Sequence, residues 1–346
     1  MLIEKRNFGK NGRGKVATLF VFKNKNGMVM EVSDFGATLY ALLVPDGKGN
    51  TLDVVLGYDD PAGYEGPGGT FFGATVGRNA NRIGKARFVL NGQEYRLDAN
   101  DGQNNLHSGY EFYNHRIWQV KAIDGNAITF SLHSPDGDQG YPGALDLDVT
   151  YTLREDNAVQ IDYLGLPEAD TIINVTNHSY FNLNGHASGS IEKHRLWLNA
   201  DHYTRADSES IPTGEIAPVE GTPMDFRLEK EVGRDIDEPY EALIFGKGYD
   251  HNWCLNNQGE FAKVAQLTGD QSGIIMEVYT DLPGVQIYSG NFLTEEPGKK
   301  TAVYRHRAGI CFETQSWPDA PNHENFPSSV YRAGTEYRTT TVYKFL

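Results

Sequence analysis

The feature that most constrains the fold of this chain is a period-two alternation of apolar and polar residues that recurs along its length. In residues 145–153 every second residue is apolar, and after the polar stretch 155–157 the alternation returns at 159–163. Because successive side chains of a strand point to opposite faces, such segments predict strands with one buried face. No stretch carries a helical stripe of a dozen residues. The sequence therefore predicts an all-β protein with only short helical turns, near residues 60–64 and 237–243.

Tight turns separate the alternating segments. Asn91-Gly92 joins residues 87–90 to residues 93–97. Asparagine followed by glycine tolerates the positive φ angles of a type I′ turn, so this is the clearest hairpin signal in the chain. The high glycine count of 38, with 19 tyrosines and 17 phenylalanines, also fits strands joined by tight turns.

A further hairpin is predicted between residues 274–280 and 285–289, across the turn at 281–284. No internal repeat, low-complexity run or linker interrupts the pattern. Many short strands at close spacing favour one large antiparallel β-sandwich, and we expect a single domain over residues 1–346.

Charge and composition narrow the function classes. The formal net charge is −15, from 31 basic and 46 acidic residues, and such a field repels nucleic acid and anionic membrane surfaces. No window approaches the roughly 18 apolar residues of a membrane span, and no signal-peptide core follows the first residues. The two cysteines, Cys254 and Cys311, form no CxxC pair or zinc spacing, so we expect no disulfide framework and no metal. A cytoplasmic protein with reduced thiols, monomeric or homodimeric, is the expectation.

Two loop-like segments carry unusual polar residues. Residues 77–83 contain two arginines and two asparagines, which suit hydrogen bonds to sugar hydroxyls, and Arg82 is also suited to holding a carboxylate. The alternative is a basic turn whose side chains lie in water, and the sequence alone favours that alternative. In residues 104–109, His107 is either a structurally satisfied histidine or a ligand for a bound oxygen, and the sequence does not decide.

The densest polar cluster is residues 174–185, which follows an apolar strand and includes His178 and Tyr180. Alternate residues of a strand share a face, so these two side chains are expected to point the same way. Histidine titrates near neutrality and can both give and take a proton. We favour a functional site here over an asparagine-rich turn.

Two carboxylates stand among apolar residues. Asp250 lies beside glycines and aromatics, a setting that suits sugar binding, although it is also suited to capping its own turn. A metal site at Asp250-His251 is disfavoured because adjacent strand residues diverge. Glu313 interrupts the apolar strand 310–315. It either points inward, where burial raises its pKa toward that of a useful base, or faces solvent, and alternation leaves both open.

The five segments described above occur in the same order in the aldose 1-epimerase (galactose mutarotase) family, which this chain resembles over nearly its whole length. They are residues 77–83, 104–109, 174–185, 246–253 and 310–315. Further matching segments are residues 34–39, 136–143, 222–227, 288–292 and 318–323. The resemblance implies a large antiparallel β-supersandwich and an isomerase that interconverts the α and β anomers of free aldoses such as galactose and glucose. One departure is Ser108-Gly109, where the family often has a second glycine, and this change affects at most a hydroxyl contact.

The resemblance also implies roles for individual residues. Glu313 is the expected general base and His178 the expected general acid. The expected substrate-binding residues are Asn81, Arg82, His107, Tyr180, Asp250 and Gln286. Ring opening and closure move only protons, so one base and one acid suffice and no cofactor is expected. A role in galactose metabolism follows only by analogy with the family.

Three alternatives stay open at this point. A hexose-6-phosphate mutarotase would need a basic cluster, which Arg78 and Arg82 could begin. A lectin on the same sandwich would bind sugar without turnover. A glycosidase would use Glu313 with Asp250 at a defined separation, which a sequence does not reveal.

Overall fold

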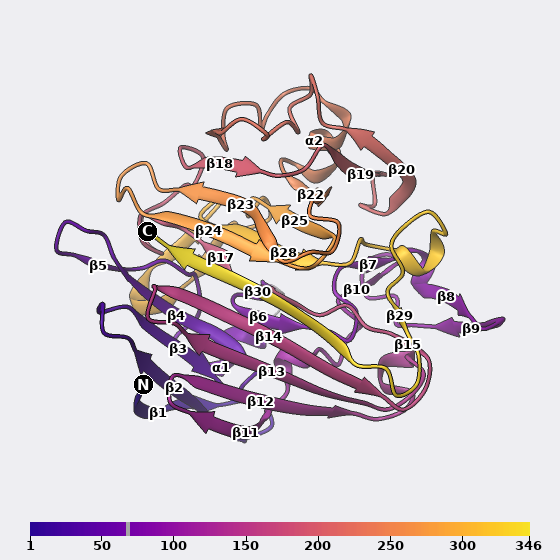
Figure 1. The fold of residues 1–346 in the computed structure, drawn as a ribbon, viewed down its shortest axis with the longest axis horizontal. Helices are drawn as coiled ribbons and strands as arrows, with labels where there is room; N and C mark the ends of the chain where they lie inside the picture. Colours follow the sequence, from indigo (N-terminus) through magenta and orange to yellow (C-terminus); the bar gives the residue numbers. More distant parts are fainter. Residues whose placement is uncertain (67–69) are drawn as a thin grey trace.

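The computed structural model describes residues 1–66 and 70–346. Three antiparallel sheets dominate it (Figure 1). The nine-stranded sheet runs in spatial order through β11 (Gln119–Asp124), β12 (Ala127–Ser134), β13 (Leu145–Leu153), β14 (Ala158–Pro167), β30 (Tyr337–Phe345), β24 (Ile275–Thr280), β23 (Ala262–Thr268), β18 (Arg195–Leu198) and β21 (Lys230–Glu231). The six-stranded sheet runs through β17 (Tyr180–Phe181), β28 (Ile310–Gln315), β25 (Gly284–Tyr288), β22 (Asp250–Cys254), β19 (His202–Ala206) and β20 (Pro212–Pro218).

The third sheet and several strand pairs complete the fold. The five-stranded sheet contains β1 (Leu2–Lys10), β2 (Val16–Lys23), β3 (Val29–Ser33), β4 (Thr38–Pro45) and β5 (Thr51–Asp53). The two-stranded pairs are β6 (Ala74–Val76) with β16 (Thr176–His178), β7 (Arg82–Ile83) with β10 (Asn105–Leu106), β8 (Arg87–Leu90) with β9 (Gln93–Arg96), β15 (Thr171–Ile172) with β29 (Val330–Tyr331), and β26 (Glu295–Pro297) with β27 (Val303–Arg305). The α-helices in the described ranges are α1 (Pro61–Tyr64) and α2 (Glu241–Gly246), neither long nor apolar enough to cross a bilayer.

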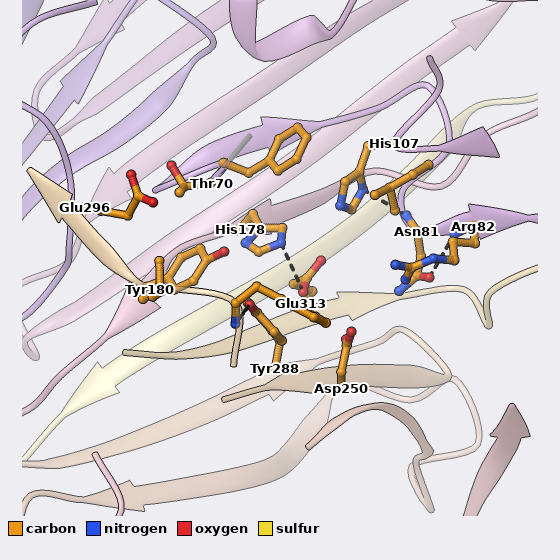
Figure 2. A pocket seen from close by; sticks show the side chains of 14 residues that line it. Thr70, Asn81, Arg82, His107, His178, Tyr180, Asp250, Tyr288, Glu296 and Glu313 are labelled. Atoms are coloured by element: carbon orange, nitrogen blue, oxygen red, sulfur yellow. Dashed lines mark hydrogen bonds and ion pairs between the residues drawn. The ribbon is translucent and has the colours of Figure 1, made fainter. Parts of the chain in front are cut away.

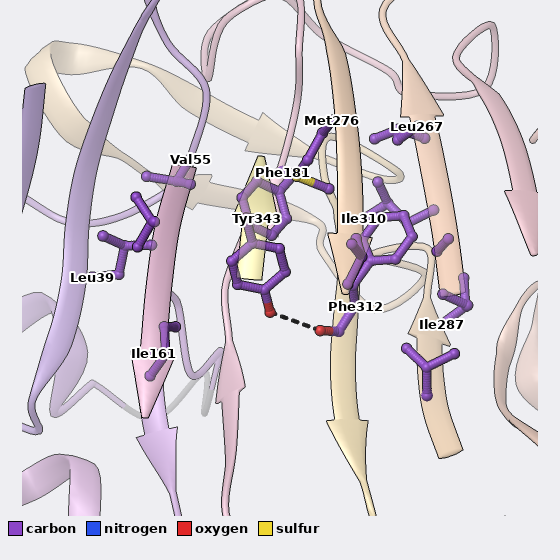
Figure 3. Packing of buried hydrophobic residues seen from close by; sticks show 14 of the residues in the cluster. Leu39, Val55, Ile161, Phe181, Leu267, Met276, Ile287, Ile310, Phe312 and Tyr343 are labelled. Atoms are coloured by element: carbon purple, nitrogen blue, oxygen red, sulfur yellow. Dashed lines mark hydrogen bonds between the residues drawn. The ribbon is translucent and has the colours of Figure 1, made fainter. Parts of the chain in front are cut away.

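The main core lies between the sheets. Strand β28 of the six-stranded sheet faces β30 of the nine-stranded sheet, and the Tyr343 hydroxyl donates to the Phe312 carbonyl over 2.9 Å (Figure 3). Tyr343 also packs on Phe181, with ring centroids 4.9 Å apart. Ile310 and Phe312 belong to this core, and because side chains alternate along a strand, Cys311 and Glu313 point to the opposite face of β28. The packing that holds β28 in place thus fixes which residues face away from the core.

Most sequence expectations for the strands are confirmed. The β8–β9 hairpin turns through Asn91 and Gly92, which have φ angles of 51° and 78°. Strands β13 and β14 pair as a hairpin, and every second residue of β13 is buried. Helix α1 lies at the predicted position, whereas α2 begins at Glu241, four residues after the predicted start, and extends to Gly246.

The hairpin predicted between residues 274–280 and 285–289 is wrong. Strand β24 pairs with β23 and β30, and β25 pairs with β22 and β28, so the chain crosses from one sheet to the other between them. The Asn257 side chain holds this crossing by donating to the carbonyls of Thr280 and Leu282. Alternation and a turn signal are the same for a hairpin and for a sheet-to-sheet crossing, which is why the pattern misled.

Candidate active site

A pocket opens above the face of β28 that points away from the core. It gathers side chains from strand ends and from two loops, as Figure 2 shows. Its lining residues are Thr70, Phe71, Asn81, Arg82, Leu106, His107, His178, Tyr180, Asp250, Tyr288, Phe292, Leu293, Glu296 and Glu313. All of the sequence-predicted site residues except Gln286 are among them.

His178 and Glu313 meet at the floor of the pocket. Nε2 of His178 lies 3.4 Å from Oε1 of Glu313, and the two residues are only 5% and 2% exposed. His178 ends β16, which packs against β28, where Glu313 stands. Within the described part of the chain, Oε2 of Glu313 is buried without a hydrogen-bond partner. The solvent-facing alternative for Glu313 is therefore wrong, and one carboxylate oxygen is left for a ligand.

Burial shifts both groups toward their neutral forms. Desolvation raises the pKa of Glu313 well above its usual value, the charge of Asp250 raises it further, and the charge of Arg82 opposes this. Desolvation lowers the pKa of His178 to about 4. The distance between them would allow an ion pair, but a buried pair of this kind is stabilised as a neutral acid next to a neutral imidazole. The ion pair and the neutral pair differ only in whether the shared proton is on His178 or on Glu313.

Aromatic rings hold the His178 imidazole in place. It stacks on Tyr180 with centroids 5.1 Å apart and planes 24° apart, and on Phe71 at 5.7 Å and 28°. Tyr180 lines the same pocket, so the two side chains point the same way as predicted, although His178 ends β16 and Tyr180 begins β17 rather than sharing one strand. Because stacking fixes the plane of the ring, it also fixes the directions in which Nδ1 and Nε2 point.

His107 reaches the pocket from a loop. Its Nδ1 accepts the backbone N–H of Asn81 over 3.1 Å, so the neutral ring carries its proton on Nε2. Burial lowers the pKa of His107 well below its usual value, and the charges of His178 and Arg82 lower it further. Asn81, His107 and Ser108 all have positive φ angles, of 63°, 52° and 78°. His107 is thus a neutral, fixed hydrogen-bond donor.

The two arginines of residues 77–83 have different surroundings. Arg82 lines the pocket, and its Nε donates to Oδ2 of Asp101 over 2.8 Å. Arg78 is fully buried, and its guanidinium donates to the carbonyl of Gly143 at 2.7 Å and to Oγ of Ser134 at 2.7 Å. The expectation of a basic turn with side chains in water is therefore wrong for this segment.

Gln286 stands behind the pocket wall. Its Nε2 donates to Oδ1 of Asp250 over 2.8 Å, and its Oε1 accepts from Gln315 at 3.4 Å. The resemblance implies that Gln286 binds substrate, and this stays a prediction; in the structure its side chain contacts Asp250, which lines the pocket.

Comparisons with known proteins identify the family to which the chain belongs. The family model described as aldose 1-epimerase matches residues 18–344. A galactose mutarotase from Bos taurus is 43% identical over 319 residues, which cover 91% of this chain and 90% of the relative. An aldose 1-epimerase from Escherichia coli (strain K12) is 36% identical over 338 residues, covering 96% of each chain. The chain belongs to the aldose 1-epimerase family.

Solved structures extend the agreement to the fold. A GalM/aldose epimerase homologue from C. elegans superimposes with a TM-score of 0.88 at 29% identity, over 95% of this chain and 99% of the other. A galactose 1-epimerase from Lactobacillus acidophilus NCFM superimposes with a TM-score of 0.86 at 26% identity, over 100% and 99%. The all-β supersandwich is thereby confirmed. As a member of the aldose 1-epimerase family, the chain is an isomerase that interconverts sugar anomers.

Several lining residues of this epimerase were not singled out from the sequence: Thr70, Phe71, Leu106, Tyr288, Phe292, Leu293 and Glu296. Tyr288 and Phe292 lie in residues 288–292, which carried part of the resemblance but were given no role. Their rings stack with centroids 6.1 Å apart at the pocket mouth, and Phe292 is half exposed. An aromatic surface beside a polar pocket suits the C–H face of a sugar, and this segment was the available signal.

Three side chains in the pocket are of metal-ligand type. One ligand atom from each of His107, His178 and Glu313 lies within 4.8 Å of the other two. The neutral His107 ring, however, accepts a backbone N–H at Nδ1 and carries its proton on Nε2, so neither nitrogen keeps a free lone pair for a metal. The arrangement fits proton transfer better than metal binding.

Proposed function

We propose that the chain opens and recloses the rings of free aldoses, galactose and glucose among them, with Glu313 as general base and His178 as general acid. The observation that supports this most directly is the 3.4 Å approach of His178 Nε2 to Glu313 Oε1 inside the pocket. In ring opening the carboxylate takes the proton from O1 while the imidazolium gives a proton to O5. The C1–O5 bond breaks, C1 becomes an aldehyde, and rotation about C1–C2 lets the ring close from the other face with the proton transfers reversed.

The electrostatics of the pair support this assignment. Before opening, the pair must hold its proton as carboxylate and imidazolium; after opening, it is carboxylic acid and neutral imidazole. Burial raises the pKa of Glu313 and lowers that of His178, so it stabilises the form that accompanies the open chain. Burial thereby brings the closed and open forms of the bound sugar closer in free energy on the enzyme. Because only protons pass between sugar and enzyme, the proposed reaction needs no cofactor.

The remaining polar groups are suited to gripping hydroxyls while C1 turns. Asp250 offers a carboxylate oriented by Gln286, and His107 offers a neutral N–H donor. Arg82 is the only one of the two nearby arginines on the pocket wall, because Arg78 is committed to buried carbonyls. This favours an unphosphorylated sugar over a sugar phosphate, which would need a basic cluster.

Polarimetry tests the proposal. Freshly dissolved α-D-galactose and α-D-glucose should lose their initial rotation faster with enzyme than without, and faster than the glucose 6-phosphate anomers equilibrate with the same enzyme. Glu313→Gln should lower kcat by about 10²–10⁴-fold, since it removes the base but keeps the shape. Glu168→Gln, at an exposed position directly after strand β14, is the matched control.

A wild-type protein that binds sugar but leaves mutarotation at its spontaneous rate would contradict the proposal and favour a lectin. Release of a monosaccharide from a glycoside would favour the glycosidase. Full activity of Glu313→Gln would refute only the assignment of the base.

A further inference from the structure

One buried group beside the pocket has no role in the chemistry above, and it is the Cys311 thiol. Its Sγ lies 3.5 Å from Nδ1 of His178, on the side of the imidazole away from Glu313. Cys311 stands two residues before Glu313 on β28 and is fully buried. Cys311 and Glu313 share one strand face, so a single element contacts both nitrogens of the acid.

The proposed reaction sets a condition on the His178 ring. Nε2 must give a proton to O5 and later take it back. In the neutral ring Nε2 must therefore be unprotonated, and the remaining ring proton must be on Nδ1. A ring with its proton on Nε2 could act as an acid only by forming an imidazolate, which is far too basic. Nδ1 thus needs a hydrogen-bond acceptor beside it.

The sulfur of Cys311 is placed to be that acceptor. Burial raises the pKa of its thiol well above the usual value, and the charges of Glu313 and Asp250 raise it further, so the sulfur stays neutral. The competing acceptor is the carbonyl oxygen of His178 itself, which lies near the ring and already accepts the backbone N–H of Gly73 over 3.1 Å. A thiol sulfur is a weak acceptor, but it remains available to Nδ1.

We propose that Cys311 is a positioning residue whose sulfur accepts the Nδ1–H of His178 and so holds the tautomer in which Nε2 can exchange the proton. This inference rests on the proposed function of His178 as the acid. Where a histidine must act as a strong base, a carboxylate commonly occupies this place and stabilises the imidazolium. A neutral sulfur stabilises the imidazolium far less, which keeps His178 ready to give its proton away.

The surroundings of His178 define what a pH measurement would report. The titratable or charged groups that face it across the pocket or from packed elements are His107, Tyr180, Tyr288, Glu296, Cys311, Glu313, Asp250 and Arg82. Activity should fall at low pH when the pair gains a second proton, which requires His178 to become protonated while Glu313 is neutral. A stronger acceptor at position 311 stabilises that imidazolium, raises the pKa of His178 and moves the acid limb of the kcat profile to higher pH.

The experiment combines ¹⁵N NMR of the histidine rings with pH profiles of kcat. The His178 resonances are identified by their loss in His178→Asn. In the wild type, neutral His178 should be protonated at Nδ1. Cys311→Ala should increase the Nε2–H tautomer and lower kcat about two- to tenfold, the effect of losing one neutral hydrogen bond, with KM unchanged. Cys311→Ser, whose oxygen is a better acceptor, should keep the tautomer and move the acid limb to higher pH. Cys254→Ala, the other buried cysteine, is the control and should change neither.

Protonation of neutral wild-type His178 at Nε2 would overturn the inference, as would a Cys311→Ala protein with unchanged tautomer and pH profile. If Cys311→Ala does not fold, Cys311→Ser decides, because an unmoved acid limb would then count against the role of the sulfur. A wild type without mutarotase activity would refute the proposed function, and the tautomer measurement would still report separately on the Cys311 contact.

Discussion

The pocket has two walls of different construction, and each carries one histidine. The strand wall consists of residues on paired strands and holds His178, Asp250 and Glu313. The loop wall consists of residues 81–82 and 106–107, two of which adopt positive φ angles. Both walls are buried, and burial lowers the pKa of the histidine on each. The environment alone therefore does not distinguish the two imidazoles.

The partner of Nδ1 distinguishes them. On the loop wall a backbone N–H points at Nδ1 of His107, which commits the ring to donating from Nε2. On the strand wall Nδ1 of His178 faces the sulfur of Cys311, and Nε2 faces a carboxylate. A ring of the first kind can only hold a sugar oxygen, whereas a ring of the second kind can exchange a proton. The comparison teaches that the role of a buried histidine follows from the hydrogen bond at its far nitrogen.

The substitution with the largest expected effect on activity is His178→Asn on the strand wall. Asparagine keeps a hydrogen-bonding side chain but cannot give and take a proton. We expect kcat to fall about 10²–10⁴-fold, with KM changed little, because the transition state loses its acid. Polarimetry over a range of galactose concentrations separates the two constants. A loss confined to KM would show that His178 only binds, and the two walls would then be equivalent.

The sequence predicted the strand wall better than the loop wall. Alternation and hairpin turns gave the all-β class, and the cluster around His178 was visible because it is dense in polar side chains and alternate residues of a strand share a face. The inward direction of Glu313 could not be predicted, because it depends on which face of β28 packs against β30, a contact between distant parts of the chain. The different positions of Arg78 and Arg82 likewise depend on carbonyls contributed by residues 142–143. The local sequence pattern thus predicts where the strands are, whereas the contacts of each side chain depend on packing between distant parts of the chain.

The second test applies the same substitution to the loop wall. His107→Asn should lower kcat/KM about tenfold, chiefly through KM, because one neutral donor to the sugar is weakened. Asparagine tolerates positive φ better than most residues, so the loop should keep its shape. The acid limb of the pH profile should stay where it is. An effect on kcat as large as that of His178→Asn would break the distinction between a fixed donor and a proton-exchanging acid.

The smallest expected effect comes from Asp101, which holds Arg82 on the loop wall. The carboxylate accepts from Arg82 Nε over 2.8 Å, and the two side chains are 39% and 15% exposed. Asp101→Asn removes the charge but keeps the shape, so Arg82 should lose some of its orientation. Partly exposed ion pairs contribute about 0.2–1 kcal/mol, which corresponds to a rise in KM of about 1.4- to fivefold. Substrate titrations by polarimetry measure the rise.

The matched control for Asp101→Asn is Asp156→Asn, which breaks an ion pair of similar length, 2.9 Å, between exposed side chains outside the pocket. It should leave KM and kcat unchanged. If Asp101→Asn instead lowers kcat with KM unchanged, Arg82 acts on the proton transfer through the charge of Glu313, whose pKa it already lowers. The loop wall would then contribute to the chemistry as well as to binding, and the division between the walls would lie at His107 rather than between loop and strand.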